Sequence, residues 1–223
     1  MNQNPQILTR SGVSALETNK VLRNTYMLLS LTLLFSALTA AISMMVVTSP
    51  WVPLASSIGA LAMIWLVLPR TANSGAGIAV VFAITGLLGF GLGPILNSYL
   101  AMSNGSQVVA TALGGTGIIF LGLSGYVLTT RKDFSFMGGF LMVGFFVVLL
   151  AAVANIFLAI PALSLAISAI VIMIMSGFIL YDTSRIINGG ETNYVLATVS
   201  LYLSIYNIFI HLLHLLGALG GDD

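Results

Sequence analysis

The sequence predicts an all-α integral membrane protein with seven transmembrane helices, six of them surrounding a central C-terminal helix. Of its 223 residues, 58% are hydrophobic and only 6% are charged, whereas soluble domains hold roughly 45–50% apolar residues. Its mean hydropathy is +1.08. The sparse charges separate seven apolar stretches, each near the ~20 residues that a helix needs to cross a bilayer. Lipid is therefore the solvent in which any function has to be explained.

The predicted spans follow one another with short connections, which makes consecutive helices antiparallel neighbours. They cover residues 25–47, 51–68, 78–100, 107–130, 136–158, 162–181 and 194–219. Together they form one bundle at residues 25–219, between an N-terminal tail at residues 1–24 and a short C-terminus at residues 220–223.

Every basic residue falls on the same side of the membrane when the chain crosses it seven times. These residues are Arg10, Lys20, Arg23, Arg70, Arg131, Lys132 and Arg185. Because cytoplasmic loops are enriched in Lys and Arg, the tail is predicted to be cytoplasmic and the C-terminus periplasmic. The net charge of +1 suggests no nucleic-acid partner, and the absence of cysteine excludes disulfides and thiolate metal sites.

The tail contains one helix-start signal. Ser14 and Glu17 have the spacing of a capping box, which predicts a short helix that starts at Ser14 and leads into the first span. The alternative is a disordered tail up to Lys20. The first apolar run is too long for the core of a signal peptide, so we expect the tail to be retained.

Glycines are frequent within two of the spans, where small residues let helices approach closely in lipid. They are Gly86, Gly89 and Gly93 in the third span, and Gly114, Gly115, Gly117, Gly122 and Gly125 in the fourth. We expect tight helix packing at both sets. Pro94 is expected to kink the third span, because proline removes one helical hydrogen bond.

The last span carries a polar stripe. Ser200, Ser204, Asn207, His211 and His214 are separated by steps of four, three, four and three, which place them on one helix face. Since polar groups facing lipid are costly, this face should point into the bundle and its helix should be central. The stripe is interpreted either as a set of structural groups that hydrogen-bond to neighbouring helices or as a path for an ion or proton.

The two histidines have helical spacing suitable for two metal ligands, but no third ligand is expected at their depth. We therefore predict no metal site and no cofactor, and consider His211 and His214 candidates for proton sensing. Gly122-Leu123-Ser124-Gly125 matches a motif of intramembrane serine proteases. However, Ser124 and His211 would differ in depth by roughly 15 Å, so we expect no catalytic residue and no enzymatic activity.

Asp182, near the end of the sixth span, allows two interpretations. It is spaced to pair with Arg185 at the membrane interface, where the helix would end. Alternatively, the helix continues and carries Asp182 into the bundle as a lone intramembrane carboxylate, which is a functional candidate by default.

Several segments together resemble the Bax inhibitor family, and within it the bacterial YccA-like subgroup. They are FGLGPI at 90–95, YDT at 181–183, ETNY at 191–194 with Asn207, KVLRNTY at 20–26, GPILN at 93–97 and LTTRKD at 128–133. The resemblance covers nearly the whole chain from Lys20 onward. It implies a seven-helix bundle with the last helix central, in the inner membrane of a bacterium.

The resemblance also implies two activities. YccA-like members bind and restrain the membrane AAA protease FtsH with its partners HflK and HflC, and other members are pH-sensitive calcium leak channels. In the leak channels an aspartate of the sixth helix pairs with one of the seventh, and an arginine of the second helix takes part. Here Asp182 matches the first aspartate, Ser204 replaces the second, and no cation lies between residues 51 and 68. The aspartate pair is incomplete, which weakens the calcium-leak mechanism.

We therefore expect a protein that modulates FtsH by contact through its tail, with Met1, Asn2, Gln3, Asn4 and Arg10 as contact candidates. The alternative is a calcium or proton leak, with Asp182, Arg185, Ser204, Asn207, His211 and His214 as pathway candidates. A third interpretation is a bundle whose polar groups only hold it together.

Overall fold

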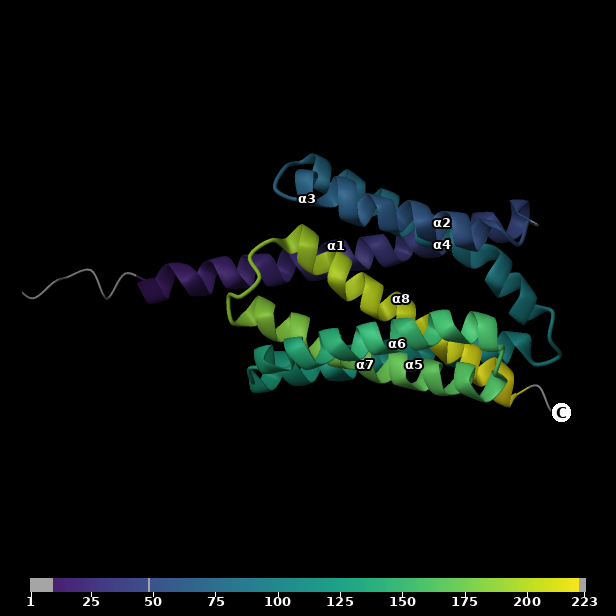
Figure 1. The fold of residues 1–223 in the computed structure, drawn as a ribbon. Coiled ribbons are helices and arrows are strands. Elements are labelled where there is room, and N and C mark those ends of the chain that lie inside the picture. Colours follow the sequence, from purple (N-terminus) through teal and green to yellow (C-terminus); the bar gives the residue numbers. More distant parts are fainter. Residues whose placement is uncertain (1–9, 48, 221–223) are drawn as a thin grey trace, which may run out of the picture.

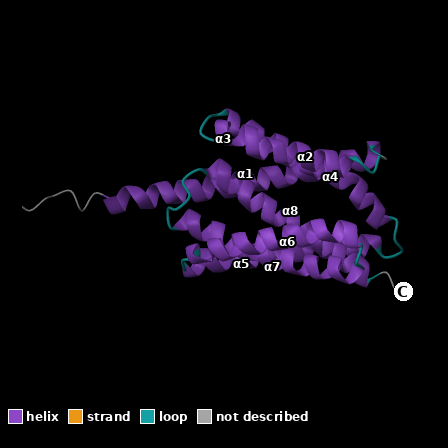
Figure 2. Ribbon diagram, viewed as in Figure 1, coloured by secondary structure: helices purple, strands orange, loops and turns teal. Residues whose placement is uncertain are grey.

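The computed structural model describes residues 10–47 and 49–220, and within them the chain is helical with no strand (Figures 1 and 2). The helices are α1 (Arg10–Val46), α2 (Val52–Ala62), the π-helical η2 (Met63–Val67), α3 (Leu68–Thr71), α4 (Ala76–Leu100), α5 (Gly105–Thr130), the 3₁₀-helical η3 (Ser135–Met137), α6 (Gly138–Leu158), α7 (Pro161–Ile187) and α8 (Tyr194–Leu219).

Seven helical segments of the described chain are long and apolar enough to cross a membrane, which confirms the predicted fold class. The α2, η2 and α3 segments form one of these spans, Val52–Thr71. The π-helical turn lies just before Pro69, where the Leu68 N–H bonds to the Met63 carbonyl. Because Pro69 has no N–H to donate, a shift of helical register at this point is expected.

The first helix differs from the prediction at its start. It begins at Arg10, so Ser14 lies inside the helix and is not its N-cap. The alternative of a disordered tail up to Lys20 is also wrong from Arg10 onward. The tail candidates Met1, Asn2, Gln3 and Asn4 lie outside the described residues, whereas Arg10 is the first residue of α1.

The ends of the helices lie at two opposite faces of the bundle. The face that holds the α3–α4, α5–η3 and α7–α8 loops, beside the first half of α1, is called the basic face (Figure 1). The other, called the neutral face, holds the α1–α2, α4–α5 and α6–α7 connections and the end of α8, and lies on the right in Figure 1. The start of α1 extends beyond the other helices at the basic face.

Helix α8 passes between two groups of helices, α1, α2 and α4 on one side and α5, α6 and α7 on the other (Figure 1). It packs against α7, α5, α1 and α4. Helix α2 instead packs on α4, and α6 packs on α7. The prediction of six helices surrounding α8 therefore needs correction, because only four form its main contacts. Helices α4 and α8 are the most buried spans.

Tight packing at glycine occurs in α4 but not along most of α5. A Cβ at Gly89 or Gly93 would overlap Ser36 or Ser43 of α1, so the two helices are in backbone contact there. By contrast, a Cβ at Gly114, Gly117, Gly122 or Gly125 would meet nothing within 4 Å. The packing prediction was wrong for these α5 glycines, because their face of the helix points away from the rest of the bundle. Pro94 lies inside α4, and the last part of α4 diverges from α2 in Figure 1.

Candidate functional site along helices α7 and α8

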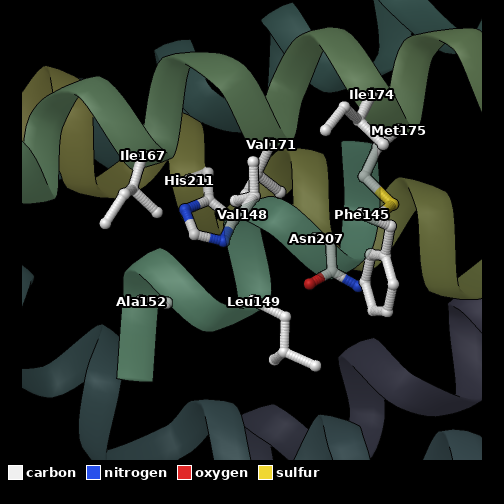
Figure 3. A pocket seen from close by; sticks show the side chains of 10 residues that line it. All are labelled: Phe145, Val148, Leu149, Ala152, Ile167, Val171, Ile174, Met175, Asn207 and His211. Carbon is white, nitrogen blue, oxygen red and sulfur yellow. The ribbon is translucent and has the colours of Figure 1, made fainter. Parts of the chain in front are cut away.

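A pocket of about 130 Å³ lies between α6, α7 and α8 (Figure 3). Its lining is apolar apart from two residues of α8, Asn207 and His211. The lining residues are Phe145, Val148, Leu149, Ala152, Ile167, Val171, Ile174, Met175, Asn207 and His211. Phe145 and Leu149 are 37% and 46% exposed, so the α6 side of the pocket borders the outer surface of the bundle. The two polar groups thus meet a space that is accessible from the lipid side.

The polar stripe of α8 is only partly inside the bundle. Ser204 is 3% exposed, and Asn207, His211 and His214 are partly buried. Ser200 is exposed, so the prediction that it points into the bundle was wrong. The amide Nδ2 of Asn207 donates to the Leu203 carbonyl of its own helix at 2.8 Å, which holds the side chain against α8.

The two histidines meet at one residue of α7. The Nδ1 atom of His214 lies 2.8 Å from the Ser168 Oγ, and the Nδ1 atom of His211 lies 3.0 Å from the same oxygen. Ser168 is 2% exposed. Sequence reasoning missed it, although a serine within the apolar run at 165–175 is a weak signal of a partner on another helix. Among the described residues, no group of three His, Asp or Glu side chains converges on one point.

Asp182 lies within α7, which continues to Ile187, and its side chain is partly buried. Arg185 does not pair with it. The Arg185 Nη2 lies 2.9 Å from the Gly190 carbonyl and 3.6 Å from the Glu191 Oε2. The predicted Asp182–Arg185 pair was wrong, because the α7–α8 loop brings a better acceptor back toward Arg185. Asp182 makes no hydrogen bond or ion pair within the described chain, and so none with Ser204.

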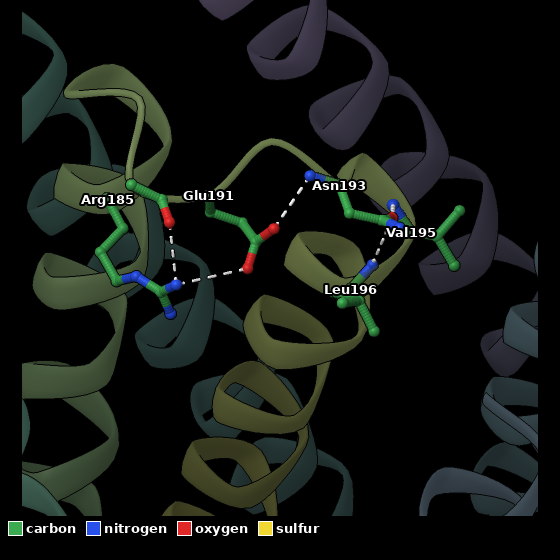
Figure 4. Close-up of polar contacts among 6 residues, drawn as sticks. Arg185, Glu191, Asn193, Val195 and Leu196 are labelled. Atoms are coloured by element: carbon green, nitrogen blue, oxygen red, sulfur yellow. Dashed lines mark hydrogen bonds and ion pairs between the residues drawn. The ribbon is translucent and has the colours of Figure 1, made fainter. Parts of the chain in front are cut away.

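Glu191 and Asn193 organise the loop before α8 (Figure 4). The other carboxylate oxygen of Glu191 accepts from the Asn193 N–H at 2.9 Å. The Asn193 Oδ1 accepts from the N–H groups of Val195 and Leu196, which caps the first turn of α8. Glu191 thus links the end of α7, through Arg185, to the cap of α8.

Asn193 also reaches across to the loop before α4. Its Nδ2 donates to the Ala72 carbonyl at 3.0 Å and to the Asn73 Oδ1 at 2.8 Å. One asparagine therefore joins the start of α8 to the α3–α4 connection. Arg70, the basic residue at this end of the second span, is exposed and donates to the Leu66 carbonyl.

Ser124 belongs to a cluster of hydroxyl groups near the basic face. Its side chain hydrogen-bonds to the Tyr26 hydroxyl and lies 3.4 Å from the Thr183 Oγ1. The histidines instead contact Ser168, toward the neutral face. The structure therefore brings Ser124 to two other hydroxyls and not to a histidine base.

Comparison with known proteins gives the same family over most of the chain. The model of the family described as "Inhibitor of apoptosis-promoting Bax1" matches residues 18–221. "Modulator of FtsH protease YccA" of Escherichia coli K12 is 57% identical over 210 residues, 94% of each chain. "Inner membrane protein YccA" of Escherichia coli O6:H1 is equally similar. An uncharacterised membrane protein of Vibrio cholerae is 50% identical over 96% of each chain.

Proposed function

The chain belongs to the Bax inhibitor family, and from this relationship we propose that it is an inner-membrane protein that binds and restrains FtsH. The observation that carries the proposal is the 57% identity, over 94% of both chains, to a protein named as a modulator of FtsH protease. We propose that it acts by contact and not by catalysis. HflK and HflC, the partners implied by the resemblance, would then be part of the same assembly.

The basic face is the surface that suits this contact. Its Lys and Arg residues favour a cytoplasmic location, and α1 extends there beyond the other helices (Figure 1). The tail at residues 1–24 would then extend into the cytoplasm and the C-terminus into the periplasm. Residues 1–9 are polar apart from a few side chains and carry no acidic group, which suits a segment that a protease takes hold of.

The test is copurification of FtsH with the full chain from membranes with and without HflK and HflC, together with the rate at which FtsH degrades a membrane substrate. In one variant, residues 1–9 are replaced by a Gly/Ser segment of equal length. In the matched control, residues 221–223 at the other end are replaced in the same way. Loss of binding and of restraint in the first variant alone supports the tail as the contact.

Two results would contradict parts of this proposal. Binding and degradation that are unchanged in the residue 1–9 variant would exclude the tail as the contact. Failure of the parent chain to bind FtsH at all would exclude the modulator function. Binding that persists without HflK and HflC would show direct contact, whereas its loss would make those proteins the contact.

A second candidate function is a proton or cation leak along the α7–α8 interface. It is favoured by the pocket at Asn207 and His211 and by the partly buried carboxyl of Asp182, which makes no hydrogen bond or ion pair within the described chain. Ser204 in place of a second aspartate leaves only one carboxyl on this interface, and hard cations prefer several charged oxygens. A proton therefore fits the interface better than calcium.

The leak is tested by proton and calcium flux into liposomes between about pH 6 and pH 8. Asp182→Asn removes the partly buried carboxyl, and Asp133→Asn is the matched control, because Asp133 lies in the exposed α5–η3 loop. Flux that falls in Asp182→Asn alone supports the leak. A parent chain that carries neither ion, in liposomes where a leak-type relative conducts, excludes it.

A further inference from the structure

The Ser168 hydroxyl lies between the Nδ1 atoms of two histidines, about two helical turns inside the neutral face. Its distances to His214 and His211, 2.8 and 3.0 Å, are both those of hydrogen bonds. The serine comes from α7 and both histidines come from α8, so the contact is formed only when these helices pack together.

The hydroxyl has a single hydrogen, and this restricts the protonation of the two rings. If neither Nδ1 carried a hydrogen, Ser168 would donate to one ring, and its oxygen would face the lone pair of the other. If both Nδ1 atoms carried hydrogens, the hydroxyl hydrogen would have no acceptor among the contacts that the structure shows. Both contacts are hydrogen bonds when one Nδ1 donates and the other accepts. The rings are then in opposite tautomers.

We propose that His211, Ser168 and His214 form one proton-binding site that holds a single shared proton and is filled from the pocket between α6, α7 and α8. His211 lines this pocket, and its Nδ1 is engaged by Ser168, so the Nε2 is the atom free to accept a proton there (Figure 3). A space of about 130 Å³ has room for water, and Asn207 and His211 supply polar partners for it, so a hydronium ion that reaches this space can protonate the Nε2 of His211.

The added proton can move from one ring to the other through Ser168. It binds at the Nε2 of His211, and that ring releases its Nδ1 proton to the Ser168 oxygen. The serine transfers its own hydrogen to the Nδ1 of His214, which becomes the cation. The same steps in reverse return the proton to the pocket through the Nε2 of His211 and restore the starting tautomers.

Among the described residues, no fixed charge lies where it would hold the added proton on one ring. On α8 itself the nearest other titratable group is Tyr206, whose hydroxyl donates to the Leu88 carbonyl of α4. On α4, Tyr99 lies against Gly217. Among the described parts of α1, α5, α6 and α7, no other titratable group lies at this end of the bundle, since Asp182 is near the basic face. Among the described residues at this end of the bundle, the two imidazole rings are therefore the groups that can hold the proton.

The proposed proton-binding site requires neither contact with FtsH nor transport of ions across the whole membrane. Its test is nitrogen NMR of the full chain in lipid nanodiscs with ¹⁵N-labelled histidine. The shifts of the ring nitrogens distinguish the two tautomers and the cation. At pH 8 the parent is expected to show one ring of each tautomer, and on acidification both rings should change together as one proton is bound.

Three variants isolate the bridge. Ser168→Ala removes the hydroxyl, so the tautomers should no longer be opposite and the rings should titrate separately. Ser168→Thr keeps a hydroxyl and should restore the joint step. Ser164→Ala is the matched control, because Ser164 lies one turn earlier on α7 and its side chain has no hydrogen bond in the structure. It should leave the spectra of the parent unchanged.

The parent alone can overturn the proposal, even if a variant does not fold. Identical tautomers in the two rings at pH 8, or uptake of protons by the two rings in independent steps, would show that they are not joined. Spectra of a folded Ser168→Ala that match those of the parent would exclude the serine as the bridge.

Discussion

The hydroxyl of Tyr202 on α8 lies 2.6 Å from the hydroxyl of Ser36 on α1, and both residues are buried. The same Tyr202 hydroxyl lies 3.3 Å from the Thr85 carbonyl on α4. A single tyrosine of α8 therefore joins this helix to both α1 and α4. Sequence reasoning did not find this contact, because Tyr202 lies outside the polar stripe of α8.

We expect Tyr202→Phe to lower the free energy of unfolding by about 1 kcal/mol, because it removes one strong interhelical hydrogen bond. Tyr206→Phe should cost less, since the Tyr206 hydroxyl reaches the Leu88 carbonyl at only 3.4 Å. Unfolding of both variants in mixed micelles measures the difference. Equal losses would show that the Tyr202 hydroxyl has no special role.

Glycines of α4 and α5 should respond differently to alanine. Gly89→Ala places a Cβ against the Ser36 backbone, so we expect a loss of about 1–3 kcal/mol from overpacking. Gly122→Ala meets open space on α5 and should be neutral, or stabilising by up to about 1 kcal/mol through helix propensity. The free energy of unfolding of the two variants checks this. The absence of a loss in Gly89→Ala would contradict the close packing of α1 on α4, and a clear loss in Gly122→Ala would contradict the open space beside Gly122.

Asn193→Ala should weaken the start of α8. It removes the acceptor for the Val195 and Leu196 N–H groups, for which we expect a loss of about 1 kcal/mol. Hydrogen exchange at these two amides should become faster. Thr192→Ala, at an exposed neighbouring position, is the control and should change neither quantity. Unchanged exchange in Asn193→Ala would exclude the cap.

The α5–η3 loop should show a pH dependence at low pH. Hydrogen bonds from Ser135 hold the pKa of Asp133 below its ordinary value of 3.8. A lowered pKa means that the ionised carboxylate stabilises the folded state above pH 3.8, and that this contribution is lost as the pH falls through the folded pKa. The effect should be small, because Asp133 is exposed.

Unfolding of the parent and of Asp133→Asn between about pH 2 and pH 6 tests this expectation. The parent should be the more stable protein only in the upper part of the range. A difference that stays constant down to the lowest pH would show that ionisation of Asp133 is not its cause.

The spans of this chain were predictable because each depends on local composition. About 20 consecutive apolar residues are stable as a helix across a bilayer wherever they occur in a sequence, so the last span was predicted at 194–219 and found there. Helix ends were less predictable. Ser14 has a cap signal but lies within α1, and α7 continues past Asp182 to Ile187. A single capping signal contributes only about 1 kcal/mol, so it does not by itself fix where a helix begins or ends.

The partners of the polar groups were decided by the tertiary structure. Asp182 lies three residues before Arg185, at a spacing that allows an ion pair on a helix, yet Arg185 pairs with Glu191. The reason is that the α7–α8 loop folds back toward Arg185, and residue spacing along a helix does not predict the path of a loop. Glycines that look alike in sequence pack against α1 from α4 and face outward from α5. In lipid the apolar surface does not specify which faces meet, so small residues and hydrogen bonds make that choice.

The sequence by itself therefore determined that this protein is a seven-helix membrane protein of the Bax inhibitor family, with its basic residues on one side. Only the tertiary structure placed Ser168 between His211 and His214, gave Asn207 and His211 a pocket, and left Asp182 without a hydrogen bond or ion pair to any described residue. The physical reason is that composition and periodicity act along one helix, whereas hydrogen bonds between helices depend on rotation and depth, which only the packed bundle fixes.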